Sequence, residues 1–176
     1  GDLFDLVRSP SWREGEARPY HSPSPRLEAA IDALVKRTLE LEKPFLKAMK
    51  AKAEAGALKI EYLLGNHDRL LEVAPRSRAA IREALGMPGG EAPFPLEARF
   101  PQAGVLAYHG HVIDKICHDA SGGASFSDLI CPELIVRFPI ELRRALGADH
   151  PRLDDIDDVR PVLAVPAWVR SLMRRE

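Results

Sequence analysis

The sequence has few cysteines, no excess of charge of either sign and no long apolar run. Its two cysteines, Cys117 and Cys131, are too few for a disulfide framework and lack the paired spacing of a structural zinc site, which favours a reducing compartment such as the cytoplasm. With 25 Lys and Arg against 26 Asp and Glu, no basic field exists to hold a polyanion, so we expect no non-specific nucleic-acid binding. No apolar run can cross a bilayer and no charged-then-apolar leader opens the chain, so we expect a soluble protein without a membrane partner.

The length of 176 residues suits a single domain, 1–176, and a hydrophobic content of 45% supplies a core. A motif begins at the very first residues, Gly1 and Asp2. The chain stops at Glu176, directly after a helical pattern. We therefore expect a truncated domain, cut at both ends.

The first half of the chain begins with a predicted irregular loop over 8–25, rich in Pro, Ser, Arg and Glu. Ser24 and Pro25 are typical of a helix start, and one apolar stripe follows at helical spacing: Leu27, Ile31, Leu34, Leu41 and Phe45. Pro44 predicts a kink or restart before Gly56. We expect this helical segment to cover one face of a sheet.

Alternating apolar residues predict strands in the middle of the chain. Residues 58–64 alternate up to Gly65, residues 96–100 resemble an edge strand, and residues 104–108 form an apolar run like a buried strand. A helix is predicted over 75–85, ended by Gly86. Strands alternating with helices favour an α/β layered fold.

The last third, 115–176, is predicted as a poorly defined helical insertion. Residues 118–127 form a Gly and Ser loop, and helices are expected to begin near Pro132, Pro139 and Pro166. The run Asp149, Asp154, Asp155, Asp157 and Asp158 lacks the spacing of a calcium loop and predicts a solvated segment.

Three polar clusters lie at the starts or ends of predicted elements: Asp2 and Asp5 in GDLFD, Gly65 to Asp68 in GNHD, and His109 to His111 in HGH. In open α/β sheets ligands gather where strands end at their carboxyl edge. Each cluster carries a metal-ligand residue type, so we expect the three to form one site.

Phosphoester hydrolysis explains these residue types. Two cations a few ångströms apart bind the phosphoryl oxygens and generate the attacking hydroxide from water. Asp2 suits the bridging position between the ions, and Asn66 and His109 suit ligation of one ion. Mixed nitrogen and oxygen ligation favours manganese, iron, zinc or cobalt over calcium.

The GNHD block also supplies predicted catalytic groups. His67 is the candidate acid for the leaving group, and Asp68 is expected to orient its imidazole. Glycines at 1, 65 and 110 would let the backbone approach the ions closely.

These blocks resemble the calcineurin-like metallophosphoesterase family. Its ordered signature is Asp-x-His, GDxxD, GNH followed by Asp or Glu, a His usually followed by Gly, and GHxH; this chain has the three middle blocks. The resemblance implies a layered α/β/β/α sandwich with two divalent transition metal ions, Asp2 as bridging ligand, Asn66 and His109 as ligands of one ion, and His67 facing the phosphate. No Asp-x-His precedes Gly1 and no GHxH follows His111, so we expect several ligands to be missing from this chain.

For other polar residues a structural or surface role is the alternative to a functional one. Asp5 is expected to be structural, and His111 is either adjacent to the ligands, facing substrate, or purely structural. Arg69 is either a phosphate contact or surface charge, as are Arg76 and Arg78. His21, His118 and His150 have no surrounding motif, and we expect exposed loop histidines.

The sequence thus predicts an enzyme that hydrolyses a phosphomonoester or phosphodiester. The alternative from another class is a non-catalytic scaffold of the same fold that binds proteins. A nuclease is a narrower alternative that the balanced charge does not favour.

Overall fold

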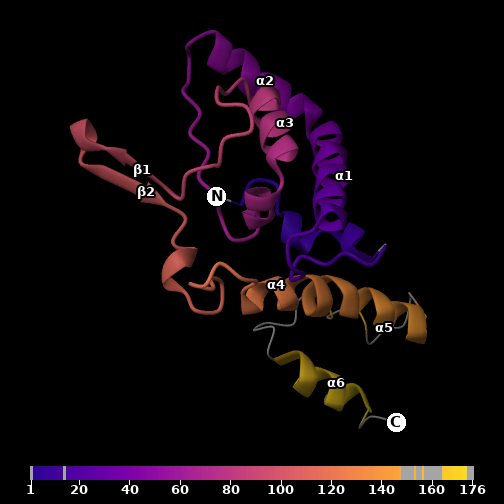
Figure 1. Ribbon diagram of the computed structural model, residues 1–176. Helices are drawn as coiled ribbons and strands as arrows, with labels where there is room; N and C mark the ends of the chain where they lie inside the picture. Colours follow the sequence, from indigo (N-terminus) through magenta and orange to yellow (C-terminus); the bar gives the residue numbers. More distant parts are fainter. Residues whose placement is uncertain (1, 14, 148–152, 154–155, 157–163, 174–176) are drawn as a thin grey trace.

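The computed structural model describes residues 2–13, 15–147, 153, 156 and 164–173, and most of its elements are helices. In Figure 1 the helices α1, α2 and α3 gather together, while a two-stranded hairpin projects away from them. The mixed helix and strand content agrees with an α/β class at the coarse level. Gly1, His150 and the five aspartates of the acidic run, Asp149, Asp154, Asp155, Asp157 and Asp158, lie outside the described residues.

The predicted helix start is confirmed. Helix α1 spans Pro25–Leu41, and Ser24 caps it by accepting the Leu27 N–H on its hydroxyl at 3.2 Å. Helix α2 spans Lys43–Glu54 with Pro44 in its first turn, so the predicted restart is also confirmed. Gly56, at a left-handed φ of 68°, follows the end of α2.

The predicted apolar stripe is correct only for its first half. Leu27, Ile31 and Leu34 are buried, whereas Leu41 is 70% exposed and Phe45 is 48% exposed. The break between α1 and α2 explains the exposure of Phe45, because a stripe continues on one face only while the helix continues unbroken, and Leu41 lies at the last residue of α1.

Helices α1 and α2 both pack against α3, which spans Pro75–Leu85. The prediction that this helical segment covers a sheet is therefore wrong. Ile81 and Leu85 of α3 are buried, and Gly86 ends the helix at a left-handed φ of 69°, as predicted.

The predicted strand over 58–64 is not formed. Tyr62 and Leu64 are buried, whereas Lys59 and Glu61 form an ion pair on the surface. Buried and exposed side chains therefore alternate as predicted. The one backbone hydrogen bond of this segment runs from the Leu64 N–H to the Pro95 carbonyl at 2.9 Å. Alternation determines which side chains are buried, but a strand also needs a neighbouring chain with free backbone groups.

The hairpin pairs β1, Glu97–Phe100, with β2, Val105–Tyr108, in antiparallel register, with Glu97 opposite Tyr108. A 3-10 turn, η4 at Pro101–Ala103, and Gly104 join the strands. The prediction of a buried strand here is wrong, since Val105 and Leu106 are each 49% exposed. Among the described residues this pair is the only sheet.

Beyond the hairpin the chain is helical. Helix α4, Phe126–Ile130, a π-helical segment η6, Cys131–Arg137, and α5, Phe138–Leu146, run on without a break, and α6 spans Val165–Met173. The helices predicted near Pro132, Pro139 and Pro166 are confirmed. The loop predicted to reach Ser127 ends earlier, because Ser125 and Asp128 form a capping box.

Four short 3-10 turns complete the elements: η1 at Leu6–Arg8, η2 at Pro10–Arg13, η3 at Arg69–Val73 and η5 at His111–Ile113. The turn η2 lies inside the predicted irregular loop of 8–25, so part of that loop is ordered. No helix in the described ranges is long and apolar enough to span a membrane.

The two leucines of the predicted stripe provide a matched test of this packing. Leu34, 7% exposed, and Leu41, 70% exposed, lie on the same helix. We expect Leu34→Ala to lower the free energy of unfolding by about 3 kcal/mol and Leu41→Ala by less than about 0.5 kcal/mol, as measured by urea denaturation. Equal losses would show that the second half of the stripe is buried after all.

Candidate functional site

A buried carboxylate joins the two N-terminal clusters of the predicted site. Asp68 is fully buried and accepts the backbone N–H of Phe4 at 3.0 Å, that of Leu6 at 3.2 Å and the Tyr62 hydroxyl at 2.5 Å. A further backbone bond runs from the Val7 N–H to the His67 carbonyl at 3.0 Å. The GDLFD segment is thereby held against the GNHD loop.

The bonds of Asp68 correct its predicted role, because another carboxylate orients His67. The Nδ1 atom of His67 lies 2.6 Å from Oδ1 of Asp5, whereas both Asp68 oxygens are used by Phe4, Leu6 and Tyr62. Burial raises the pKa of Asp68 above its ordinary value, and it also raises the pKa of Tyr62.

Asp5 reaches His67 from an unusual backbone conformation. It is the one non-glycine residue with positive φ in the described part of the chain, at φ 47° and ψ 47°. This left-handed region is costly for most side chains but is tolerated by Asp, and such residues cluster at functional sites. Asp5, expected to be structural, therefore directly contacts the candidate catalytic histidine.

The electrostatics of His67 follow from its two neighbours. Hydrogen bonds to Asp5 and, to a lesser extent, to the buried Cys131 raise the pKa of the imidazole to about 10, against the opposing effect of burial. The ring is therefore an imidazolium at neutral pH and carries a positive charge beside Asp2 and Asn66.

Asp2 connects the GNHD loop to the third cluster. Its Oδ1 accepts the backbone N–H of His67 at 3.0 Å, and its Oδ2 lies 3.0 Å from Nε2 of His109. His109 follows directly after β2, so the hairpin delivers it to the site. The three clusters predicted from the sequence to share a site are adjacent in the structure.

The second histidine of the HGH cluster supports the first. Nδ1 of His111 lies 3.2 Å from Nδ1 of His109. Burial lowers the pKa of His111, as do His109 and His118 beside it, so the ring is neutral and one nitrogen can accept a hydrogen bond. That contact orients the His109 ring so that Nε2 faces Asp2. Gly110, which separates the two histidines in the sequence, has a left-handed φ of 91°.

Asn66 is the third predicted ligand of one ion. Its side chain is 5% exposed, and no hydrogen bond of its amide is found within the described part of the chain. It directly precedes His67, whose backbone N–H is held by Asp2. The Asn66 amide atoms are not among the fully buried unpartnered atoms of the described residues, so solvent or a ligand can reach them.

Arg69 is anchored rather than free. Its Nε donates to Oδ2 of Asp128 at 2.6 Å and its Nη2 donates to the Pro19 carbonyl at 3.0 Å. Arg78 is also buried and donates to the backbone carbonyls of Leu71, Glu72 and Glu91. The buried guanidinium of Arg78 holds loops together, so its alternative of surface charge is wrong.

The closest pair of candidate ligand atoms is in direct contact. Asp2 Oδ2 and His109 Nε2 lie 3.0 Å apart, the distance of a hydrogen bond or ion pair. No group of three or more His, Cys, Asp or Glu side chains among the described residues is arranged to hold a metal ion. Asp2 and His109 are two side chains of these types. Asn66 is not counted with them, because its side chain is an amide.

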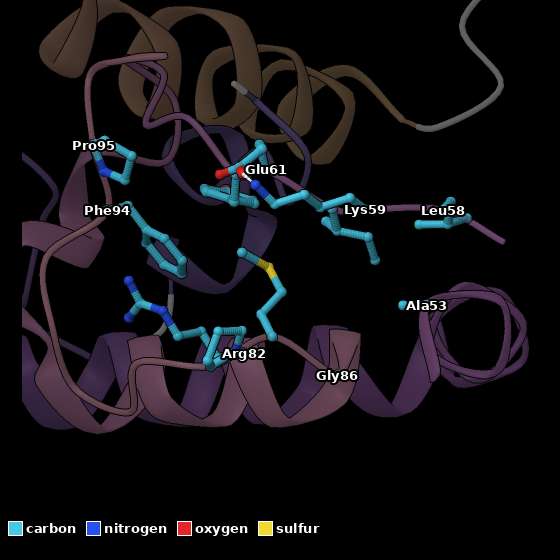
Figure 2. Close-up of a pocket in the computed structure, with 12 residues that line it drawn as sticks. Ala53, Leu58, Lys59, Glu61, Arg82, Gly86, Phe94 and Pro95 are labelled. Atoms are coloured by element: carbon cyan, nitrogen blue, oxygen red, sulfur yellow. Dashed lines mark ion pairs between the residues drawn. The ribbon is translucent and has the colours of Figure 1, made fainter. Parts of the chain in front are cut away.

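One surface pocket away from the site lies between the extended segment 58–62, the end of α3 and Pro95. Figure 2 shows Lys59 and Glu61 paired on one side and Arg82 beside Phe94, with the guanidinium carbon 4.2 Å from the ring centre. None of the predicted ligands or catalytic residues lines this pocket. We therefore place the candidate site elsewhere, at Asp2, His67 and His109.

Sequence patterns missed several residues that shape the site. Tyr62 was expected only as a strand residue, Asp128 and Cys131 carried no motif, and His118 was expected to be an exposed loop histidine, yet it is half-buried beside His111, with ring centres 5.9 Å apart. The contacts of Asp128 and Cys131 join residues distant in sequence, and those of Tyr62 and His118 depend on how their loops fold.

Comparisons with models of protein families, with curated protein sequences and with solved structures found no match.

The hydrogen bond from Tyr62 to the buried carboxylate of Asp68 can be tested by removing only the Tyr62 hydroxyl and keeping the aromatic ring. We expect Tyr62→Phe to lower the free energy of unfolding by about 2 kcal/mol, because Asp68 loses a donor that water cannot replace. Tyr108→Phe is the matched control, since Tyr108 is half exposed, and should change stability by less than about 0.5 kcal/mol. Equal values in chemical denaturation would contradict the assigned role of Tyr62.

Proposed function

We propose that this protein is a metal-dependent phosphoesterase with a dinuclear centre, of the calcineurin-like metallophosphoesterase class. The observation that carries the proposal is the position of Asp2, which touches both the His67 backbone and the His109 ring. Residues of three separate sequence blocks meet there, and they are the types that bind divalent transition metals and phosphoryl oxygens.

Asp2, Asn66 and His109 would hold one ion, with Asp2 as the bridge to a second. The ions, as manganese, iron, zinc or cobalt, would neutralise the phosphoryl oxygens and activate water for attack on phosphorus. The second ion belongs to the proposal through the family resemblance, because it needs further ligands.

His67 would act on the phosphoryl group as a cation. With a pKa of about 10 it keeps its proton at neutral pH, so it stabilises negative charge on phosphoryl oxygens better than it transfers a proton. Asp5 would orient the imidazole through the 2.6 Å contact at Nδ1. Asp68 would contribute indirectly by holding the Asp5 segment in place.

The layered α/β/β/α sandwich is part of the same proposal. An isolated two-stranded hairpin is marginally stable in water, and β2 exposes Val105, Leu106 and Tyr108. Pairing of the hairpin with further strands would bury these residues and would give His109 a rigid base.

A non-catalytic scaffold is the second candidate, favoured by the apolar surface near the hairpin. Leu96, Leu106, Val112 and Ile113 are all exposed, and grouped apolar surface is typical of protein contacts. A scaffold needs no metal, whereas the unpartnered amide of Asn66 and the cationic His67 have their explanation in phosphoester chemistry.

Loss of a ligand tests the enzyme against the scaffold. A preparation of the protein that holds both metal ions should hydrolyse p-nitrophenyl phosphate in the presence of Mn²⁺, and Asn66→Ala or His109→Ala should lower kcat/KM by about 100-fold or more. His21→Ala is the control, because His21 is exposed and lies outside the site. Unchanged turnover in both Asn66→Ala and His109→Ala would contradict the assignment of these residues as metal ligands. No turnover by protein that holds both ions would favour the non-catalytic scaffold.

The Asp5 contact gives a separate prediction. Asp5→Asn should lower kcat about tenfold or more without changing the Mn²⁺ concentration required, because the imidazole loses its anionic partner but the ligands stay. The loss of charge should also lower the pKa of His67, which NMR titration of the ring protons measures. A raised metal requirement with unchanged kcat would place Asp5 among the ligands instead.

A further inference from the structure

A small cavity opens beside the candidate site. It has a volume of about 80 Å³ and is lined by Arg69, Glu72, His111, His118, Asp119 and Ser125, among others. His111 belongs to both places, because it contacts His109 on one side and packs against His118 in the cavity. Arg69 comes directly after the GNHD block. A group bound in the cavity would therefore be next to a phosphoryl group bound at Asp2, His67 and His109.

The charges of the lining disfavour a second anion. Glu72 and Asp119 are acidic, and the one guanidinium, that of Arg69, is already paired with the buried Asp128 at 2.6 Å. Leu96 and Cys117 also line the cavity, so part of its wall can contact the carbon atoms of a ligand. A hydroxyl group both donates and accepts hydrogen bonds, so it matches a wall with both kinds of partner.

Two of these side chains are available to a ligand. Within the described ranges no hydrogen bond of the Glu72 carboxylate or of the His118 ring nitrogens to protein is found, whereas Asp119 is held by the backbone and hydroxyl of Ser121 at 2.9 and 2.8 Å. Glu72 can accept from a hydroxyl, and His118 can donate or accept. Recognition would therefore fall on Glu72 and His118.

The size of the cavity limits the ligand. A volume of about 80 Å³ holds about three water-sized groups, which suits a short hydroxylated chain and is too small for a nucleobase. We infer that the cavity receives the alcohol part of a small polyol phosphate, so that a short polyol phosphomonoester is the substrate class. This inference rests on the proposed function, because it assigns a place for the leaving alcohol of that reaction.

The test compares one polyol phosphate with one aryl phosphate. The purified protein with Mn²⁺ is assayed on glycerol 3-phosphate and p-nitrophenyl phosphate. Glu72→Gln and His118→Ala should each reduce the ratio of the two kcat/KM values, polyol over aryl, by about tenfold, because each removes a hydrogen bond to a hydroxyl. The controls Glu54→Gln and His21→Ala change exposed residues outside the cavity and should leave the ratio unchanged.

A third variant perturbs the wall without removing a polar group. A Cβ atom at Gly123 would lie 2.5 Å from Oδ2 of Asp119, so Gly123→Ala should push that carboxylate aside. The loop is exposed, so folding should be preserved. The same ratio should fall in this variant, by less than in Glu72→Gln because Asp119 is already bonded to Ser121.

Binding without catalysis gives an independent measurement. Glycerol 3-phosphate added to the metal-free protein should shift the NMR signals of the His118 ring, and inorganic phosphate should not. Turnover of p-nitrophenyl phosphate with no fall of the ratio in Glu72→Gln and His118→Ala, and no shift at His118, would overturn the inference while leaving the proposed function standing. Absence of metal-dependent turnover on both compounds would overturn both.

Discussion

The carboxylate of Asp68 is the constraint on which the site depends. A buried carboxylate is costly unless its oxygens are satisfied, and here two backbone N–H groups of the GDLFD segment and the Tyr62 hydroxyl satisfy them. The donors are available only when that segment lies against the GNHD loop. The requirement to satisfy one anion therefore fixes the position of the whole N-terminal segment.

The other contacts of the site follow from that position. Once the segment is in place, Asp5 lies against the His67 ring and one oxygen of Asp2 lies against the His67 backbone. The second oxygen of Asp2 is left to face His109 at the end of the hairpin. Two carboxylates thus contact one histidine on different sides: Asp5 contacts its ring, and Asp2 joins its backbone to His109, the candidate ligand. The resulting arrangement of positive charge beside candidate ligands suits a phosphoryl group.

Local signals predicted the helices well and the sheet poorly. Ser24 with Pro25 and Gly86 with the preceding apolar spacing are complete within a few residues, and both boundaries are confirmed. Alternation over 58–64 is equally clear, yet a strand needs hydrogen bonds from another chain segment, and Pro95 supplies only one. The site was predicted to the level of its three clusters. The contact of Asp5 with His67 was not predicted, because Asp68 directly follows His67 in the sequence whereas Asp5 lies 62 positions away.

The sequence by itself determined where the helices begin, which residue types gather into blocks and the order of those blocks along the chain. Capping, helical spacing and motif composition are local properties, so they need no knowledge of the fold. The tertiary structure alone decided that Asp5 contacts His67, that Asp68 is buried with Tyr62, and that His118 lines a cavity with Arg69. These pairings join residues far apart in sequence or select between equivalent side chains. Only the packing of the whole chain determines which donor each buried acceptor meets.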